Sequence, residues 1–382
     1  MAVDFRVYSS LPLVKNPAVF NIPKTMRAAV YRGVNDICIE TVPVPRIGAK
    51  ELLVKVAVCG VCPTDIKKIQ HGTLPPPRIF GHETAGTIVK IGALVRGFKL
   101  GDRVALHHHV PCMDCHFCRH HAFAQCQTYK RTGITAGFEP AGGGFAEYVR
   151  VMNFVLPGVV KIPRKNSFDE GAMLEPVNTV LKAVKRLHLL PGDVVLVAGQ
   201  GPIGLMFTKL LALQGIRVVA TDMLQPRLRL AKKFGAQWTA LASSASLFEQ
   251  VAKWTGGKGL DAAIVAVQSD AAVAQALQNV RGAGQVLLFA HTKADSQFKL
   301  DLADICAQEK DLIGSYSSDF TLQKAVAQLV FSRKLDVRLL ISHTFPLEKT
   351  SKAIDLASFP EPKSLKVLVS ADFRPDLCEK EF

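Results

Sequence analysis

The sequence predicts an α/β protein with two domains, one a doubly wound parallel sheet and the other rich in β-strands. Strand and helix patterns alternate between residues 194 and 290, which is typical of βαβ units. A glycine-rich turn joins an apolar strand to a helix inside that stretch. Strand patterns dominate the region before about residue 155. The 382 residues are enough for two domains, each with its own core.

The β-rich part is predicted from short β-branched runs that are bounded by proline and glycine turns. Strands are expected at 27–31, 37–41, 51–58, 84–91 and 103–106, with β character continuing through 142–155. The pattern changes near Ser167, where apolar residues at helical spacing predict one helix over 169–189.

The alternating part begins with a fully apolar run at 194–198, which fits a strand buried on both faces. Helices follow at 205–214, 227–234 and 271–278, with strands at 217–221, 262–267 and 285–290. Beyond about residue 314 the pattern is mixed. Helices are expected at 322–332 and 347–356, and strands near Thr344 and at 364–370.

The turn after the first buried strand has the spacing G-x-G-x-x-G and opens a helix. Gly199 permits the tight turn, Gly201 lets the backbone approach a pyrophosphate, and Gly204 lets the helix pack on the strand. The helix N-terminus offers free N–H groups and a positive dipole to phosphates. An isolated motif of this kind is weak evidence, but its position between strand and helix favours a dinucleotide site.

Asp222 ends the next strand, 18 residues after Gly204. Its carboxylate is expected to accept hydrogen bonds from the adenosine ribose and to repel a 2′-phosphate, which favours NAD over NADP. Arg227 either covers the adenine or reaches a hydroxyl of the cofactor, or is an exposed helix charge. The predicted cofactor-binding residues are Gly199, Gly201, Pro202, Ile203, Gly204, Asp222 and Arg227.

Four cysteines with the spacing C-x2-C-x2-C-x7-C indicate a closed, tetrahedral zinc site that builds structure and does no chemistry. The ligands are Cys112, Cys115, Cys118 and Cys126. Disulfides and an iron–sulfur cluster are the alternatives. The other cysteines are dispersed, which favours a reducing compartment over disulfides, and known cluster motifs have different spacings.

A second metal set is suggested by Cys62, His82, Glu83 and Glu175. One thiolate, one imidazole and one or two carboxylates make a plausible catalytic zinc site with an open position for water or substrate. Each residue alone is weak evidence, because a single cysteine is usually a small buried apolar residue. Their occurrence beside a nucleotide fold and a four-cysteine lobe strengthens the interpretation.

These motifs together resemble the zinc-dependent medium-chain alcohol dehydrogenases, and most closely the sorbitol (L-iditol) and threonine dehydrogenase branch. The resemblance covers about residues 26–369. It rests on Cys62-Pro63-Thr64-Asp65, Gly81-His82-Glu83, the cysteines after His109-Val110-Pro111, residues 142–148, Glu175-Pro176, the G-x-G-x-x-G turn and residues 314–318.

The resemblance implies that Cys62 and His82 are ligands of the catalytic zinc, and it leaves open whether Glu83 or Glu175 is the bound carboxylate. Zinc would activate a substrate hydroxyl, and a hydride would pass to the nicotinamide. Thr64 is then the first proton acceptor, and Cys62, Thr64, His82 and Glu175 are the expected catalytic residues. Lys67 occupies the position where many relatives have a relay histidine, so the route of proton exit stays open.

The resemblance also implies a domain plan. A GroES-like catalytic domain would comprise 1–177, with an extension at 1–25 and a structural zinc lobe at 107–127, together with 314–382. A Rossmann NAD-binding domain would comprise 178–313. Two zinc ions and one NAD are expected per subunit, in a homodimer or homotetramer.

The composition excludes some function classes. Hydrophobic residues make up 48% and charged residues 21%, which is typical of a globular protein, and there is no apolar run long enough to span a membrane. The formal net charge of +15 suits anionic cofactors. No long Lys/Arg run accompanies it, so nucleic acid is not an expected partner. The cysteine pattern favours the cytoplasm.

We therefore expect NAD-dependent oxidation of a secondary alcohol to a ketone. The small-molecule substrate would be a polyol, a sugar alcohol or a hydroxy-amino acid. One alternative is an NAD(P)H-dependent reductase of aldehydes or ketones from the same superfamily. The alternative from another class is a non-catalytic relative that binds nucleic acid.

Overall fold

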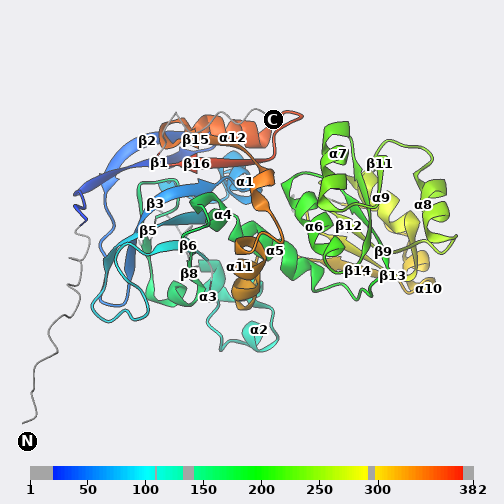
Figure 1. Cartoon of the computed structure of the whole chain (residues 1–382), viewed down its shortest axis with the longest axis horizontal. Coiled ribbons are helices and arrows are strands. Elements are labelled where there is room, and N and C mark those ends of the chain that lie inside the picture. Colours follow the sequence, from blue (N-terminus) through cyan, green and yellow to red (C-terminus); the bar gives the residue numbers. More distant parts are fainter. Residues whose placement is uncertain (1–19, 108–109, 132–141, 291–296, 373–382) are drawn as a thin grey trace, which may run out of the picture.

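The computed structural model describes residues 20–107, 110–131, 142–290 and 297–372. Two large sheets lie beside each other along the longest axis of the molecule (Figure 1). Most of the extension predicted at 1–25 lies outside the described residues.

The first large sheet is parallel throughout and has the order β11-β10-β9-β12-β13-β14. Helices connect its strands, which confirms the doubly wound fold. Its strands are β9 (Val194–Ala198), β10 (Arg217–Asp222), β11 (Trp238–Leu241), β12 (Leu260–Val265), β13 (Val280–Leu288) and β14 (Asp311–Gly314). Its helices are α6 (Pro202–Ala212), α7 (Gln225–Phe234), α8 (Leu247–Thr255), α9 (Asp270–Asn279) and α10 (Leu302–Ala307). All five residues of β9 are buried, as the apolar run predicted.

The second large sheet has the order β15-β16-β3-β5-β6-β8, with β7 paired to β3, and a smaller sheet has the order β2-β1-β4. The strands are β1 (Thr25–Gly33), β2 (Asp36–Pro43), β3 (Leu52–Gly60), β4 (Arg78–Ile79), β5 (Glu83–Ile91), β6 (Arg103–Leu106), β7 (Tyr148–Val151), β8 (Val160–Lys161), β15 (Ile341–Pro346) and β16 (Lys366–Ser370). β16 pairs with β3, so late strands complete a sheet that early strands began. This arrangement confirms the β-rich, GroES-like part of the fold.

The remaining helices pack around these sheets. They are α1 (Pro63–His71), α2 (His116–Arg119), α3 (Gln127–Arg131), α4 (Phe168–Ala172), α5 (Leu174–Val184), α11 (Gln323–Phe331) and α12 (Thr350–Ser358). Short 3-10 turns are η1 (Phe123–Gln125), η2 (Asn153–Gly158), η3 (Phe320–Leu322), η4 (Val337–Leu340) and η5 (Leu347–Lys349). Among the described residues, no helix combines the length and apolarity that a membrane crossing requires.

Two predicted elements are wrong. The single helix over 169–189 is divided at Met173 into α4 and α5, because Pro176 in the first turn of α5 is incompatible with an unbroken helix through that point. The β character expected through 142–155 is limited to β7 and an isolated bridge between Ala146 and Ala28, and the 3-10 turn η2 follows β7.

Helix α5 lies between the two large sheets (Figure 1). Val177 and Val180 of this helix belong to the same buried cluster as Val195 of β9 and Val326 of α11. The core therefore runs without interruption from one sheet to the other, and the predicted boundary at 177/178 falls inside α5.

Candidate functional site

A cavity of about 760 Å³ opens between the two sheets. The predicted residues that line it come from both sides: Cys62, Thr64, His82, Glu83 and Glu175 from one, and Gly201, Pro202, Ile203 and Arg227 from the other. The structure therefore places the predicted reactive-metal residues and the glycine turn on one common cleft.

Cys62 reaches the cleft because helix α1 begins directly after it. Its Sγ caps the helix by accepting the backbone N–H of Thr64 at 3.5 Å. Pro63 is the first helical residue, where its fixed φ is suitable and its missing N–H costs nothing. The sequence pattern of Cys62 and Pro63 thus turns both Cys62 and Thr64 toward the cavity.

His82 is buried and held in one orientation by Asp65, whose Oδ1 lies 3.1 Å from Nδ1 of the ring. Burial disfavours the charged imidazole, but the charge of Asp65 and the contact with Cys62 outweigh it and hold the pKa of His82 well above its ordinary value. Since Asp65 engages Nδ1, a metal would bind His82 through the other ring nitrogen.

Glu83 is also buried, and its partner is a lysine that the sequence reasoning missed. Lys366 Nζ lies 2.6 Å from Glu83 Oε1 and donates to the carbonyl oxygen of Val61 at 2.8 Å. Both side chains are at most 7% exposed. Gly60 makes room for this pair, because a Cβ there would stand 1.9 Å from Glu83 Oε2.

The ligand atoms of Cys62, His82 and Glu83 lie within 4.8 Å of one another, the arrangement that one metal ion requires. Glu175 is not part of that group, although it lines the same cleft from the first turn of α5. Burial raises the pKa of Glu175 to about 7, although the charge of His82 acts to lower it. Of the two carboxylates, Glu83 is the one placed with the thiol and the imidazole.

The four cysteines of the second predicted site gather in a lobe of residues 110–131, here called the cysteine lobe. Their Sγ atoms lie within 4.8 Å of one another, with Cys115 and Cys112 at 3.5 Å and 3.9 Å from Cys118. A disulfide would need about 2.05 Å, whereas the edge of a zinc–thiolate tetrahedron is about 3.8 Å. The spacing of these thiols fits one shared ion.

The glycine turn has the geometry of a phosphate cradle. Gly199 has a φ of +90°, and a Cβ on Gly204 would lie 1.7 Å from the carbonyl oxygen of Gly199. A Cβ on Gly201 would meet no described atom within 4 Å. Gly199 and Gly204 are thus required by the fold, while Gly201 keeps space open at the N-terminus of α6.

Asp222 is buried behind this turn, where its carboxylate accepts the N–H of Gln200 at 2.6 Å and that of Leu224 at 2.9 Å. Arg227 lies 3.9 Å from Asp222 and donates to the carbonyl oxygen of Ser364 at 3.3 Å. Its side chain is 17% exposed, and within the described part of the chain its buried Nε has no acceptor. The alternative of an exposed helix charge is therefore wrong for Arg227.

A further connection that sequence reasoning missed joins the cysteine lobe to the cleft. The hydroxyl of Tyr129, which lines the cleft, is hydrogen-bonded to Ser317 Oγ, and the ring of Phe123 meets that of Phe320 edge-on at 6.1 Å. Ser317 has a φ of +61°, a left-handed conformation that non-glycine residues rarely adopt. The lobe thus braces a strained part of the cleft wall.

Comparisons with known proteins agree with this architecture. Residues 48–164 match the alcohol dehydrogenase GroES-like domain, and residues 202–332 match the zinc-binding dehydrogenase family. The sorbitol dehydrogenase of Bacillus subtilis (strain 168) is 30% identical over 91% of this chain and 98% of its own length. The sorbitol dehydrogenase of Bombyx mori is 31% identical over 90% of this chain and 97% of its own length.

A solved structure from Sinorhizobium meliloti 1021, which is bound to NADP, has a TM-score of 0.82 and 28% identity, covering 91% of this chain and all of its own. Sequence and fold therefore lead to the same assignment over nearly the whole chain. The chain belongs to the zinc-binding alcohol dehydrogenases, in the branch of the sorbitol dehydrogenases.

Proposed function

We propose that this enzyme is an NAD-dependent polyol dehydrogenase that oxidises a secondary hydroxyl to a ketone. The observation that carries the proposal is the group of Cys62, His82 and Glu83, which opens on the same cleft as the glycine turn. The names of the matched relatives support a polyol substrate. They favour neither of the two alternatives, the reductase and the non-catalytic relative.

The donor set fits a catalytic zinc site. One sulfur, one ring nitrogen and one carboxylate lie close enough for a single ion, and the half-buried thiol faces the cavity. Cys62, His82 and Glu83 would hold the metal, with Glu175 as a second carboxylate beside it. Zinc bound there supplies a Lewis acid that lowers the pKa of a hydroxyl.

The chain's own groups orient the reactants and move the proton. Asp65 fixes the ring of His82, and Lys366 fixes the carboxylate of Glu83. Thr64 lines the cleft two residues after Cys62, where its hydroxyl would accept the substrate proton while passing its own proton on to water. Lys67 also lines the cleft, and it borders the path by which that proton would leave.

The cofactor site is proposed on the residues around the first turn of α6. The open space at Gly201 and the buried, unpaired Nε of Arg227 fit a bound dinucleotide. Each oxygen of Asp222 accepts one backbone N–H, which leaves lone pairs for ribose hydroxyls. The negative charge of Asp222 opposes a 2′-phosphate, so we propose NAD rather than NADP.

The remaining assignments are proposals on the same footing. The cysteine lobe would hold a second, structural zinc. Residues 1–177 with 314–382 would form the catalytic domain, and 178–313 the Rossmann domain. A homo-oligomer is supported by β14, which ends its sheet with Leu312 40% exposed. The free thiols of the described cysteines support a cytoplasmic location.

The decisive test is NADH formation from a panel of polyols, with His82→Ala as the variant and His188→Ala, an exposed histidine outside the cleft, as its control. Wild type and the control are expected to turn over, and the His82 variant is expected to lose activity and one zinc ion per chain. Full activity without His82, or preferential reduction of aldehydes with NADPH, would contradict the proposal.

A further inference from the structure

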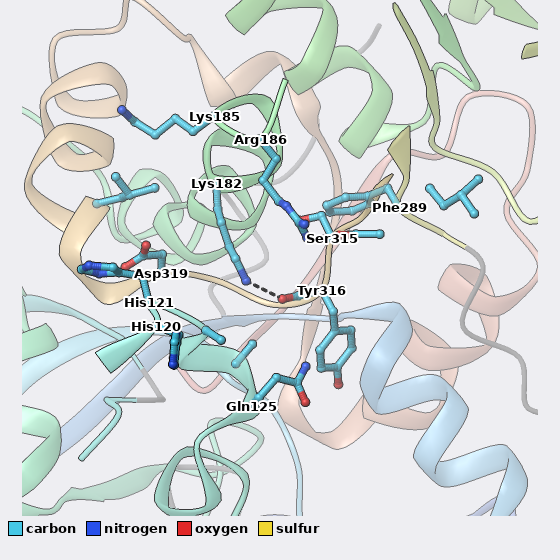
Figure 2. A pocket seen from close by; sticks show the side chains of 15 residues that line it. His120, His121, Gln125, Lys182, Lys185, Arg186, Phe289, Ser315, Tyr316 and Asp319 are labelled. Carbon is cyan, nitrogen blue, oxygen red and sulfur yellow. Dashed lines mark hydrogen bonds between the residues drawn. The ribbon is translucent and has the colours of Figure 1, made fainter. Parts of the chain in front are cut away.

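A second cavity, of about 740 Å³, adjoins the catalytic cleft (Figure 2). It lies between helix α5 and the cysteine lobe. Four residues line both cavities: Ala124, Phe289, Ser315 and Tyr316. A ligand that leaves the catalytic cleft past these residues enters this second space.

The walls of this cavity carry an excess of positive charge. Lys182 lies in the last turn of α5, Lys185 and Arg186 follow directly after the helix, and His120 and His121 of the cysteine lobe stand nearby (Figure 2). The lining contains one carboxylate, Asp319. That carboxylate is already engaged, because its Oδ1 accepts both the N–H and the hydroxyl of Thr321, at 2.9 Å and 2.6 Å.

Two of the cations are fixed in place without being neutralised. Lys182 Nζ donates to the carbonyl oxygen of Tyr316 at 2.7 Å, and Arg186 donates to that of Gly314. Carbonyl oxygens carry no net charge, so both cations keep their charge and most of their donors. Burial lowers the pKa of Lys182, with the charge of Asp319 opposing this and that of Arg186 adding to it.

Ser315 supplies an independent observation. It is 7% exposed and lines the cavity, yet its hydroxyl has no hydrogen-bond partner among the described residues. Cations near a helix C-terminus are expected from the helix dipole alone. The dipole does not explain an unpaired buried hydroxyl in the wall of the same cavity.

We propose that this cavity is a subsite for a phosphate group at the far end of the substrate, so that the enzyme acts on polyol phosphates. A phosphate monoester offers a double negative charge and three acceptor oxygens, which match the ammonium group of Lys182, the guanidinium of Arg186 and the hydroxyl of Ser315, with the charge of Lys185 adding to the positive field. This inference rests on the proposed function and names the class of its substrate.

The test compares kcat/KM for sorbitol and for sorbitol 6-phosphate with saturating NAD+. We expect the phosphate to raise kcat/KM about tenfold or more, since charge-assisted bonds are the strong ones. Lys185→Glu and Lys182→Gln are each expected to reduce that ratio about tenfold. Lys253→Glu, a change of an exposed lysine on the remote helix α8, should leave the ratio unaltered.

A ratio near one in the wild type, or a ratio that neither variant changes, would overturn the subsite while leaving the polyol dehydrogenase intact. An equal gain with gluconate would overturn the assignment to phosphate. If no polyol is oxidised, the proposed function fails. The subsite is then decided by calorimetric titration of inorganic phosphate into NAD-saturated protein: binding that Lys185→Glu abolishes supports it, and no binding refutes it.

Discussion

The buried ion pair of Lys366 and Glu83 allows the free energy of unfolding to be predicted with and without a metal at the Glu83 carboxylate. Replacing Lys366 with Met removes the cation 2.6 Å from a carboxylate that is 2% exposed and leaves that carboxylate without its ion-pair partner. Breaking a buried pair in this way costs about 3–5 kcal/mol. We expect that loss in metal-free protein and a clearly smaller loss with zinc, because a metal at Cys62 and His82 would supply the missing positive charge.

The assay is urea denaturation with and without zinc, followed by far-ultraviolet circular dichroism. Tryptophan fluorescence is unsuitable, because both tryptophans stack together in the parallel-sheet domain, at Trp238 and Trp254. Lys161→Met is the matched control, since Lys161 pairs with Asp102 at the surface, where such pairs contribute about 0–1 kcal/mol. A loss below about 1 kcal/mol for metal-free Lys366→Met, or an equal loss with zinc, would refute the reasoning.

The other predictions concern the cofactor, the lobe and the second carboxylate. Asp222→Asn should raise the kcat/KM ratio of NADP+ to NAD+ about tenfold, because it removes the repelling charge and keeps one acceptor; a wild type that already prefers NADP+ would contradict it. Cys126→Ser should lower the zinc content by one ion per chain and weaken substrate binding through Tyr129; unchanged zinc content would exclude the lobe as a metal site. Burial raises the pKa of Glu175 from 4.5 to about 7, so metal-free wild type should lose stability as the pH rises from 4.5 through 7. Glu175→Gln should remove that loss, which amounts to about 2.5 kcal/mol between denaturation curves at pH 5 and pH 8. An equal change of stability with pH in wild type and Glu175→Gln would refute the interpretation that Glu175 is a buried carboxylate without a compensating charge.

The sequence predicted the features that are encoded locally. The apolar run of β9 and the glycines that follow it depend on neighbours a few residues away, and the cysteines of the lobe lie within one short window. The division of α4 from α5 could also have been predicted from the sequence, because Pro176 is incompatible with a continuous helix.

Contacts between segments far apart in the chain could not be predicted from the sequence. Lys366 lies 283 residues from Glu83, and Ser317 lies 188 residues from Tyr129. Only the fold brings them together. One signal for Lys366 was present, since a lysine between Leu365 and Val367 in an apolar strand is unusual unless it has a buried partner.

The position of β16 in its sheet bears on the order in which this enzyme is completed during synthesis. Glu83 enters a buried strand early, whereas the cation that balances it is 283 residues further along the chain. A nascent chain that ends before β16 therefore leaves the C-terminal part of β3, from Val58 to Gly60, without this neighbour and leaves Glu83 without its lysine. Metal bound by Cys62, His82 and Glu83 before Lys366 emerges would supply the missing positive charge, so we expect the yield of folded enzyme to depend on the supply of metal during translation.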